Sequence, residues 1–152
     1  TGYLQRHPDY RSDPRVKLYP SWAQDSVTQD DDAIARIVGP LLKGGLASMK
    51  KMYDAGTQVV AGTDTMIATN LHAEIASYVD GGLTPFQALQ TATVNSARAL
   101  NLDAGTLEPG KLADIALIEG DPRADIANTF KVKTVVANGV VHQVADLIAA
   151  VQ

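Results

Sequence analysis

One carboxylate, that of Asp64, follows the apolar run of residues 57–61 and the two small residues Gly62 and Thr63. A parallel strand that ends in this way presents its last side chains at the carboxyl edge of a sheet or barrel, where α/β proteins place their catalytic groups. A rigidly held carboxylate there can take a proton from an attacking water molecule and return it to a leaving group. Taken alone, the motif favours a turn residue after a strand, so its role depends on the rest of the chain.

Histidine and cysteine are the other side chains that commonly complete a catalytic metal site. The chain has no cysteine, and its 3 histidines are His7, His72 and His142. They form no His-x-His pair, and none of them ends an apolar strand before Asp64. Because a metal site typically needs three or four ligands, we expect this chain alone to bind a metal ion weakly or not at all.

Three residues that follow Asp64 are candidates for contact with a substrate. Thr65 is its direct neighbour, and His72 and Glu74 lie where a helix is expected to begin. Each has a structural alternative: Thr65 can orient the Asp64 carboxylate, His72 can cap the helix or face solvent, and Glu74 can be a first-turn carboxylate stabilised by the helix dipole.

Composition excludes several classes of function. The chain has 152 residues, a formal net charge of −4 and 45% hydrophobic residues, which is ordinary for a globular domain but short for a complete (β/α)8 barrel. Its acidic balance argues against a nucleic-acid partner. No apolar run reaches the length of about 20 residues that a membrane span needs, and the N-terminus lacks a signal-peptide pattern. We therefore expect a soluble protein that does not bind membranes, with its compartment (cytoplasmic, or periplasmic or secreted) left open.

The central part of the chain predicts alternating strands and helices. Helical patterns cover residues 30–55, with a break at Gly39-Pro40, and a strand is expected over 57–61. A helix follows around residues 71–78, and the capping box of Thr84 and Gln87 begins another that extends to Leu100. Short links between these elements favour a parallel α/β unit.

Both ends of the chain differ from this central part. Residues 1–29 are rich in proline, tyrosine and arginine and predict an irregular loop or connector. Near the other end, Val/Ile-rich strands are expected over 112–118 and 132–141, with a hairpin turn at Asn138-Gly139. We expect four regions: a connector (1–29), a barrel portion (30–102), β-sandwich strands (103–145) and a tail (146–152).

A resemblance to a known family rests on an ordered set of short motifs. The motifs are AGTDT at residues 61–65, LHAEI at 71–75, GLTPFQAL at 82–89, TATVN at 91–95, GTLEPGKLADI at 105–115 and VVANG at 135–139. Together they resemble the C-terminal part of the amidohydrolase superfamily, in its imidazolonepropionase-like and prolidase-like branch. The resemblance covers the chain from about Lys50 onward.

The resemblance implies an α/β fold: the C-terminal portion of a distorted (β/α)8 TIM-type barrel plus strands of a small β-sandwich subdomain, in which Asp114 is structural. It also implies a metal-dependent hydrolase that cleaves a C–N amide, cyclic amide or peptide-like bond in a small-molecule or peptide-like substrate. Asp64 matches the family's final aspartate, which binds the metal and handles the proton of the attacking water. The cofactor would be a divalent metal, one or two zinc ions, held in the intact enzyme.

Two other assignments remain open. The chain can be a non-catalytic binding module that retains Asp64 as a relic, or one half of a hydrolase assembled from two chains. Because the chain opens at Thr1 without a methionine, we expect a processed protein or a part of a longer one. Its partners would then be the missing N-terminal portion of the same enzyme or further copies in a homo-oligomer, since open sheet edges favour self-association.

Overall fold

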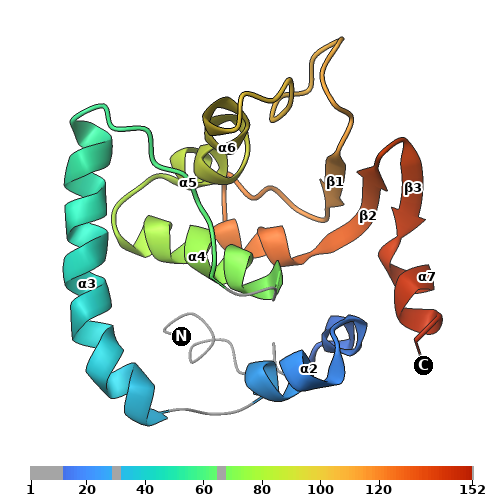
Figure 1. The fold of residues 1–152 in the computed structure, drawn as a ribbon, viewed down its shortest axis with the longest axis horizontal. Coiled ribbons are helices and arrows are strands. Elements are labelled where there is room, and N and C mark those ends of the chain that lie inside the picture. Colours follow the sequence, from blue (N-terminus) through green and yellow to red (C-terminus); the bar gives the residue numbers. More distant parts are fainter. Residues whose placement is uncertain (1–11, 29–31, 65–67, 152) are drawn as a thin grey trace.

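Helices make up most of the computed structural model, which describes residues 12–28, 32–64 and 68–151 (Figure 1). The α-helices are α2 (Ser21–Thr28), α3 (Asp32–Asp54), α4 (Ala68–Asp80), α5 (Pro85–Ala92), α6 (Val94–Ala99) and α7 (Val144–Ala149). Two 3-10 helices are η2 (Pro14–Leu18) and η3 (Ile126–Phe130). The strands β1 (Ile115–Ile118), β2 (Val132–Ala137) and β3 (Val140–Gln143) form one antiparallel sheet in the order β1-β2-β3.

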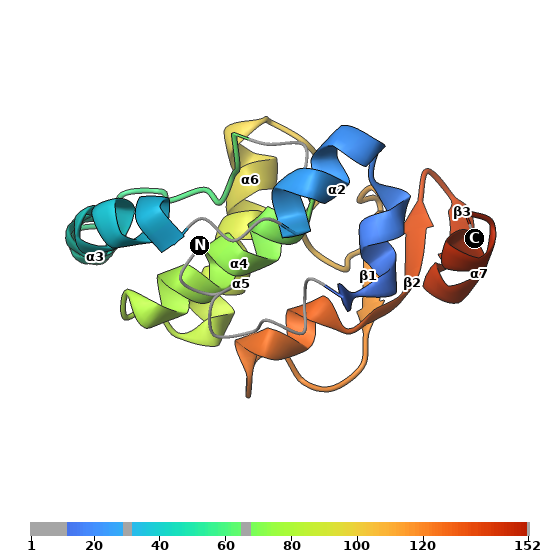
Figure 2. The ribbon, with the colours of Figure 1, turned by 90° about the horizontal axis from the view of Figure 1, so that it is seen from below.

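The helix α3 lies along one side of the molecule (Figures 1 and 2). It is 23 residues long and continues without a break through Pro40. The predicted break at Gly39-Pro40 is therefore wrong. Proline removes one helical hydrogen bond, but α3 continues through this exposed position. The C-terminal half of α3 packs on α4 through Met49.

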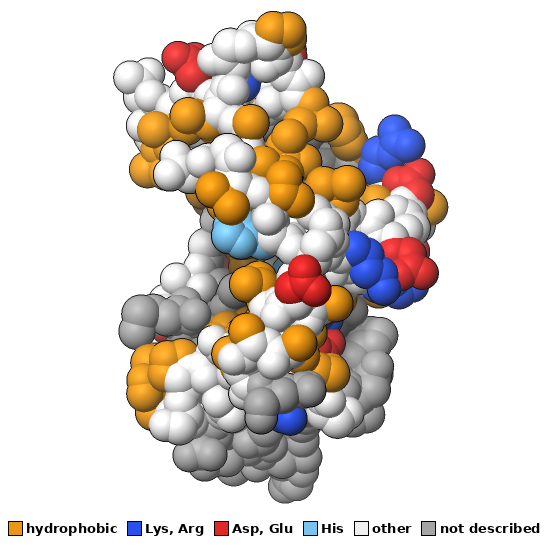
Figure 3. Space-filling view, turned by 90° about the vertical axis from the view of Figure 1, so that its right-hand side faces the viewer, with side chains coloured by type: hydrophobic (Ala, Val, Ile, Leu, Met, Phe, Trp, Pro, Cys, Tyr) orange, Lys and Arg blue, Asp and Glu red, His pale blue; other side chains and the backbone are white. Residues whose placement is uncertain are grey.

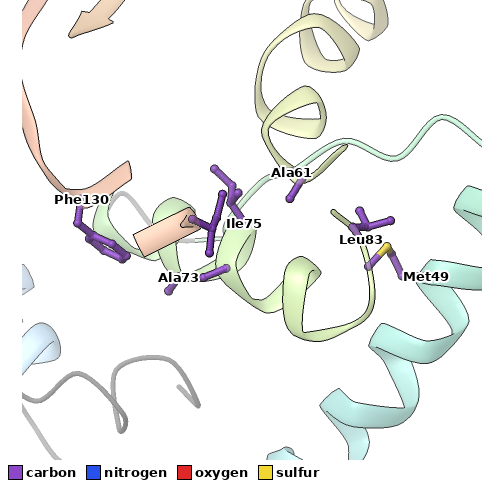
Figure 4. Packing of buried hydrophobic residues seen from close by; sticks show 9 residues of the cluster. Met49, Ala61, Ala73, Ile75, Leu83 and Phe130 are labelled. Atoms are coloured by element: carbon purple, nitrogen blue, oxygen red, sulfur yellow. The ribbon is translucent and has the colours of Figure 1, made fainter. Parts of the chain in front are cut away.

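The helix α4 lies at the centre of the main core, between α3, α5 and η3. The helix contributes Ala73, Ile75 and Ala76 to this core, and Figure 4 shows Ala73 and Ile75 among the side chains of the surrounding segments. The core consists of Met49, Ala61, Ala73, Ile75, Ala76, Leu83, Ala88, Ile126 and Phe130.

Residues 57–63 lie outside any helix and form no β-ladder within the parts of the chain that the structure describes. The predicted strand over 57–61 is therefore wrong here, because a strand requires a neighbouring strand to receive its backbone hydrogen bonds. The expected parallel pairing is likewise not found in the described ranges, where the sheet is antiparallel. What is shown is a mixed helix and strand fold with a small antiparallel sheet.

The capping box at the start of α5 is confirmed. The amide of Gln87 donates to Thr84 Oγ1 at 3.2 Å, and the amide of Thr84 donates to Gln87 Oε1 at 2.9 Å. The single helix expected up to Leu100 is instead divided into α5 and α6, because Thr93 leaves the helical conformation with φ −125° and ψ −98°.

The predicted hairpin at Asn138-Gly139 is also confirmed, with φ of +50° and +77° at the two turn residues. The carboxylate of Asp114 accepts a hydrogen bond from the Asn138 amide at 3.0 Å, which fits the structural role expected for it. After β3 the chain forms α7 within the region expected to be strand and tail.

The N-terminal segment is helical where it is described, so the expectation of irregular chain is wrong for residues 14–18 and 21–28. The 3-10 helix η2 packs against α7, and Arg15 donates a side-chain hydrogen bond to the carbonyl of Phe130. These contacts between the two ends of the sequence give η2 a surface on which to fold.

Two glycines in the loop after α6 should differ in how much stability is lost when each is replaced by alanine. Gly105 has φ +82°, and a Cβ there would lie 2.8 Å from backbone atoms of Thr93 and Val94, whereas Gly110 has φ +88° and nothing within 4 Å. We expect Gly105→Ala to lower the free energy of unfolding by roughly 3 kcal/mol and Gly110→Ala by about 1 kcal/mol, since only the first adds a backbone clash to the strain. Urea denaturation measures both values, and equal losses would contradict this packing.

Candidate functional site

The segment that carries Asp64, residues 57–64, is held by the junction of α5 and α6. The amide of Ala61 donates to the carbonyl of Thr91 at 3.0 Å, and the Asn95 side-chain amide donates to the carbonyl of Val59 at 2.9 Å. The side-chain amide of Gln58 in turn donates a hydrogen bond to the carbonyl of Asn95 at 2.8 Å. Helical residues therefore take the place of a partner strand.

A second attachment of residues 57–64 comes from α4. Glu74 Oε1 accepts a hydrogen bond from the amide of Gly62 at 3.3 Å and another from the hydroxyl of Tyr78 at 2.5 Å. Burial and the neighbouring Glu74 carboxylate raise the pKa of Tyr78 above its ordinary value, so the phenol keeps its proton and remains the donor.

Asp64 itself is exposed, as are Gly62 and Thr63 before it. The structure thus presents the carboxylate to solvent at the end of an anchored stretch of backbone, where a reacting molecule can reach it. The candidate Thr65 lies outside the described residues.

His72 lies in a different environment from Asp64. Its ring packs against Phe130 with the centroids 4.9 Å apart, and its Nδ1 is buried with no hydrogen-bond partner within the described ranges. Burial, and to a lesser extent the charge of Arg15, lowers the pKa of His72 to about 4. The imidazole is therefore neutral at pH 7.

The structure does not bring His72 and Glu74 together. Positions i and i+2 of an α-helix point about 200° apart around its axis. His72 therefore contacts η3, whereas Glu74 contacts residues 57–64. Contact of either side chain with a substrate stays a prediction.

The described residues do not fit a metal ion by themselves. They contain no group of three or more His, Cys, Asp or Glu side chains that could hold one, and Asp64 contributes a single carboxylate. A metal bound near Asp64 would need ligands from elsewhere.

Four residues of the site had no assigned role in the sequence: Gln58, Tyr78, Thr91 and Asn95. Two signals could have indicated three of them. Tyr78 follows Glu74 at the i,i+4 spacing that places two helical side chains together. Thr91 and Asn95 are the first and last residues of the motif TATVN.

Comparison with known proteins gives close matches to one family. The profile of the amidohydrolase family matches residues 21–141. The 5-methylthioadenosine/S-adenosylhomocysteine deaminase of Moorella thermoacetica is 37% identical over 124 residues, covering 64% of this chain and 29% of the relative. Imidazolonepropionase of Deinococcus deserti is 36% identical over 118 residues, covering 71% of this chain and 29% of the relative. The chain thus spans less than a third of the length of these relatives.

Two solved structures resemble the fold. The crystal structure of an amidohydrolase matches with a TM-score of 0.57 and 26% identity, covering 65% of this chain and 26% of that one. The crystal structure of a Xaa-Pro dipeptidase with methionine bound in its active site matches with a TM-score of 0.62 and 23% identity, covering 88% and 33%. At that identity the second match supports the fold alone.

The lowered pKa of His72 predicts a loss of stability in acid. The unfolded chain takes up a proton at His72 near pH 6.5, whereas the folded chain does so only near pH 4, so the free energy of unfolding falls as the pH drops through this window. Linkage puts the loss at about 3 kcal/mol by pH 4. Urea denaturation between pH 7 and pH 4 measures it, and we expect His72→Gln to show a smaller loss than the unmodified chain. An equally steep loss in both would contradict the burial of a neutral imidazole.

Proposed function

The chain belongs to the amidohydrolase family, as its ordered motifs predicted, and from this premise we propose that it supplies the acid–base carboxylate of a C–N bond hydrolase. The observation that carries the proposal is the presentation of Asp64 to solvent from residues 57–64, which two groups of helices anchor. The names of the matched relatives, deaminases and imidazolonepropionase, support a hydrolytic reaction on a small molecule.

The chemistry assigned to Asp64 is proton transfer. Its carboxylate accepts a proton from the water that attacks the carbon of the scissile C–N bond, and returns that proton to the departing nitrogen. An anchored backbone serves this role because proton transfer requires the carboxylate within about 2.6–3.2 Å of the reacting groups.

We also propose that the intact enzyme holds one or two divalent metal ions, which we expect to be zinc. Asp64 would be one of its ligands, and a bound metal would supply activated water. The co-ligands would come from other parts of a longer polypeptide or from a partner chain, since the described residues do not complete a site.

The architecture proposed for the intact enzyme is a (β/α)8-type barrel with a β-sandwich, to which this chain contributes residues 30–102 and 103–145. Apolar side chains are spread over the side of the molecule on which β3 and α7 lie (Figure 3). Leu117 and Val141, which the strand register places on the same face of the sheet, are 50% and 61% exposed. Exposed apolar surface of this kind supports a second protein layer over the sheet.

As for location, none of the helices in the described ranges is long and apolar enough to cross a membrane.

Substitution of Asp64 tests the proposed function directly. We expect Asp64→Asn in the full-length protein to lower kcat by about 10²–10⁴-fold, because an amide cannot accept the proton of the attacking water. Release of ammonia is measured on adenine and on methylthioadenosine. Asp146→Asn, an exposed carboxylate on α7, is the matched control. Unchanged turnover in Asp64→Asn would exclude the assignment.

Zinc titration tests where the co-ligands lie. We expect the 152-residue chain to show no stoichiometric zinc binding below about 100 μM by calorimetry, because a single carboxylate is a weak zinc site, whereas the full-length protein retains the metal through dialysis. Tight one-to-one binding by the 152-residue chain would show instead that its own residues form a complete site.

A further inference from the structure

The carboxylate of Glu74 has two hydrogen-bond donors that come from different parts of the structure. One is the amide of Gly62, two residues before Asp64, and the other is the hydroxyl of Tyr78 on the same face of α4. A carboxylate oxygen that accepts two bonds from fixed groups has a defined orientation, and bonds to a charged acceptor are stronger than neutral ones.

This attachment complements the one made by α5 and α6. Those helices hold residues 57–64 through the Val59 carbonyl and the Ala61 amide, and Glu74 holds the same backbone from α4 at Gly62. Three helices therefore restrain this stretch, and the hydrogen bond from α4 is made at Gly62, which of these bonded residues lies nearest to Asp64 in the chain. Within the described ranges no strand pairs with this segment.

The hydrogen bond from the Tyr78 hydroxyl restrains the Glu74 carboxylate. It is half-buried, one helical turn beyond Glu74, and the position of its hydroxyl limits the rotamers that the carboxylate can adopt. The raised pKa of Tyr78 keeps the phenol protonated, so it donates throughout the neutral and mildly alkaline range.

We propose that Glu74 is a positioning residue, which together with Tyr78 fixes the Gly62 amide and thereby orients the backbone that presents Asp64. The proposal rests on the proposed role of Asp64 and gives Glu74 a role other than contact with the substrate. Packing alone would need only the volume of the side chain, whereas positioning needs its oxygen acceptor. The two roles therefore predict different outcomes for isosteric variants.

Amide hydrogen exchange on the ¹⁵N-labelled 152-residue chain tests the proposal without a substrate. We expect Glu74→Met to lower the protection of the Gly62 amide, relative to the core amide of Ala88, by about tenfold or more. Glu74→Gln, which keeps an oxygen acceptor at the same length, is expected to remain within about threefold of the unmodified chain. Tyr78→Phe is expected to fall between the two.

Ser77→Ala is the matched control on α4. The Ser77 hydroxyl bonds to the Ala73 carbonyl within the helix and should leave the protection of Gly62 unchanged. The amide order parameter of Asp64, from ¹⁵N relaxation, shows whether the effect reaches the carboxylate-bearing residue; we expect it to fall in Glu74→Met only.

Two results would overturn the proposal. If Glu74→Met protects Gly62 as well as Glu74→Gln does, the side chain acts through packing. If Gly62 loses protection while the order parameter of Asp64 is unchanged, the bond does not position Asp64. Because both readouts are independent of turnover, a failure of the Asp64→Asn experiment on the full-length protein can be told apart from a failure of this one.

Discussion

The attachment of residues 57–64 to helices is the constraint on which the site depends. An extended segment must satisfy its backbone donors and acceptors. Here Thr91, Asn95 and Glu74 receive or supply those bonds. The segment is thus hydrogen-bonded to α4, α5 and α6, and Asp64 at its end is exposed.

The motifs shared with the family acquire a physical meaning from this arrangement. The motif at residues 91–95 supplies Thr91 and Asn95, which bond to residues 57–64. The motif at residues 71–75 supplies Glu74. Gly105, which begins the motif at residues 105–115, lets the loop after α6 approach Thr93 and Val94. Motifs that are separate in the sequence thus converge on residues 57–64 and on the junction of α5 and α6 that holds them.

The helix α4 contacts the core on one side and the backbone of residues 57–64 on another. His72 faces Phe130 and the neighbourhood of Arg15, where burial keeps the imidazole neutral. Glu74 faces the backbone that leads to Asp64. The helix therefore joins the apolar core to the candidate site, and a shift of α4 on that core would move the Gly62 anchor with it.

The sequence by itself determined the family, the capping box at Thr84 and the hairpin at Asn138-Gly139, because these depend on local patterns of a few residues. It also indicated Asp64, although not what holds it. Only the tertiary structure decided that η2 forms against α7, and that Glu74 bonds to Gly62 while His72 turns away. These features depend on contacts between residues distant in the chain or on which face of a helix meets a neighbour, and local periodicity carries neither kind of information.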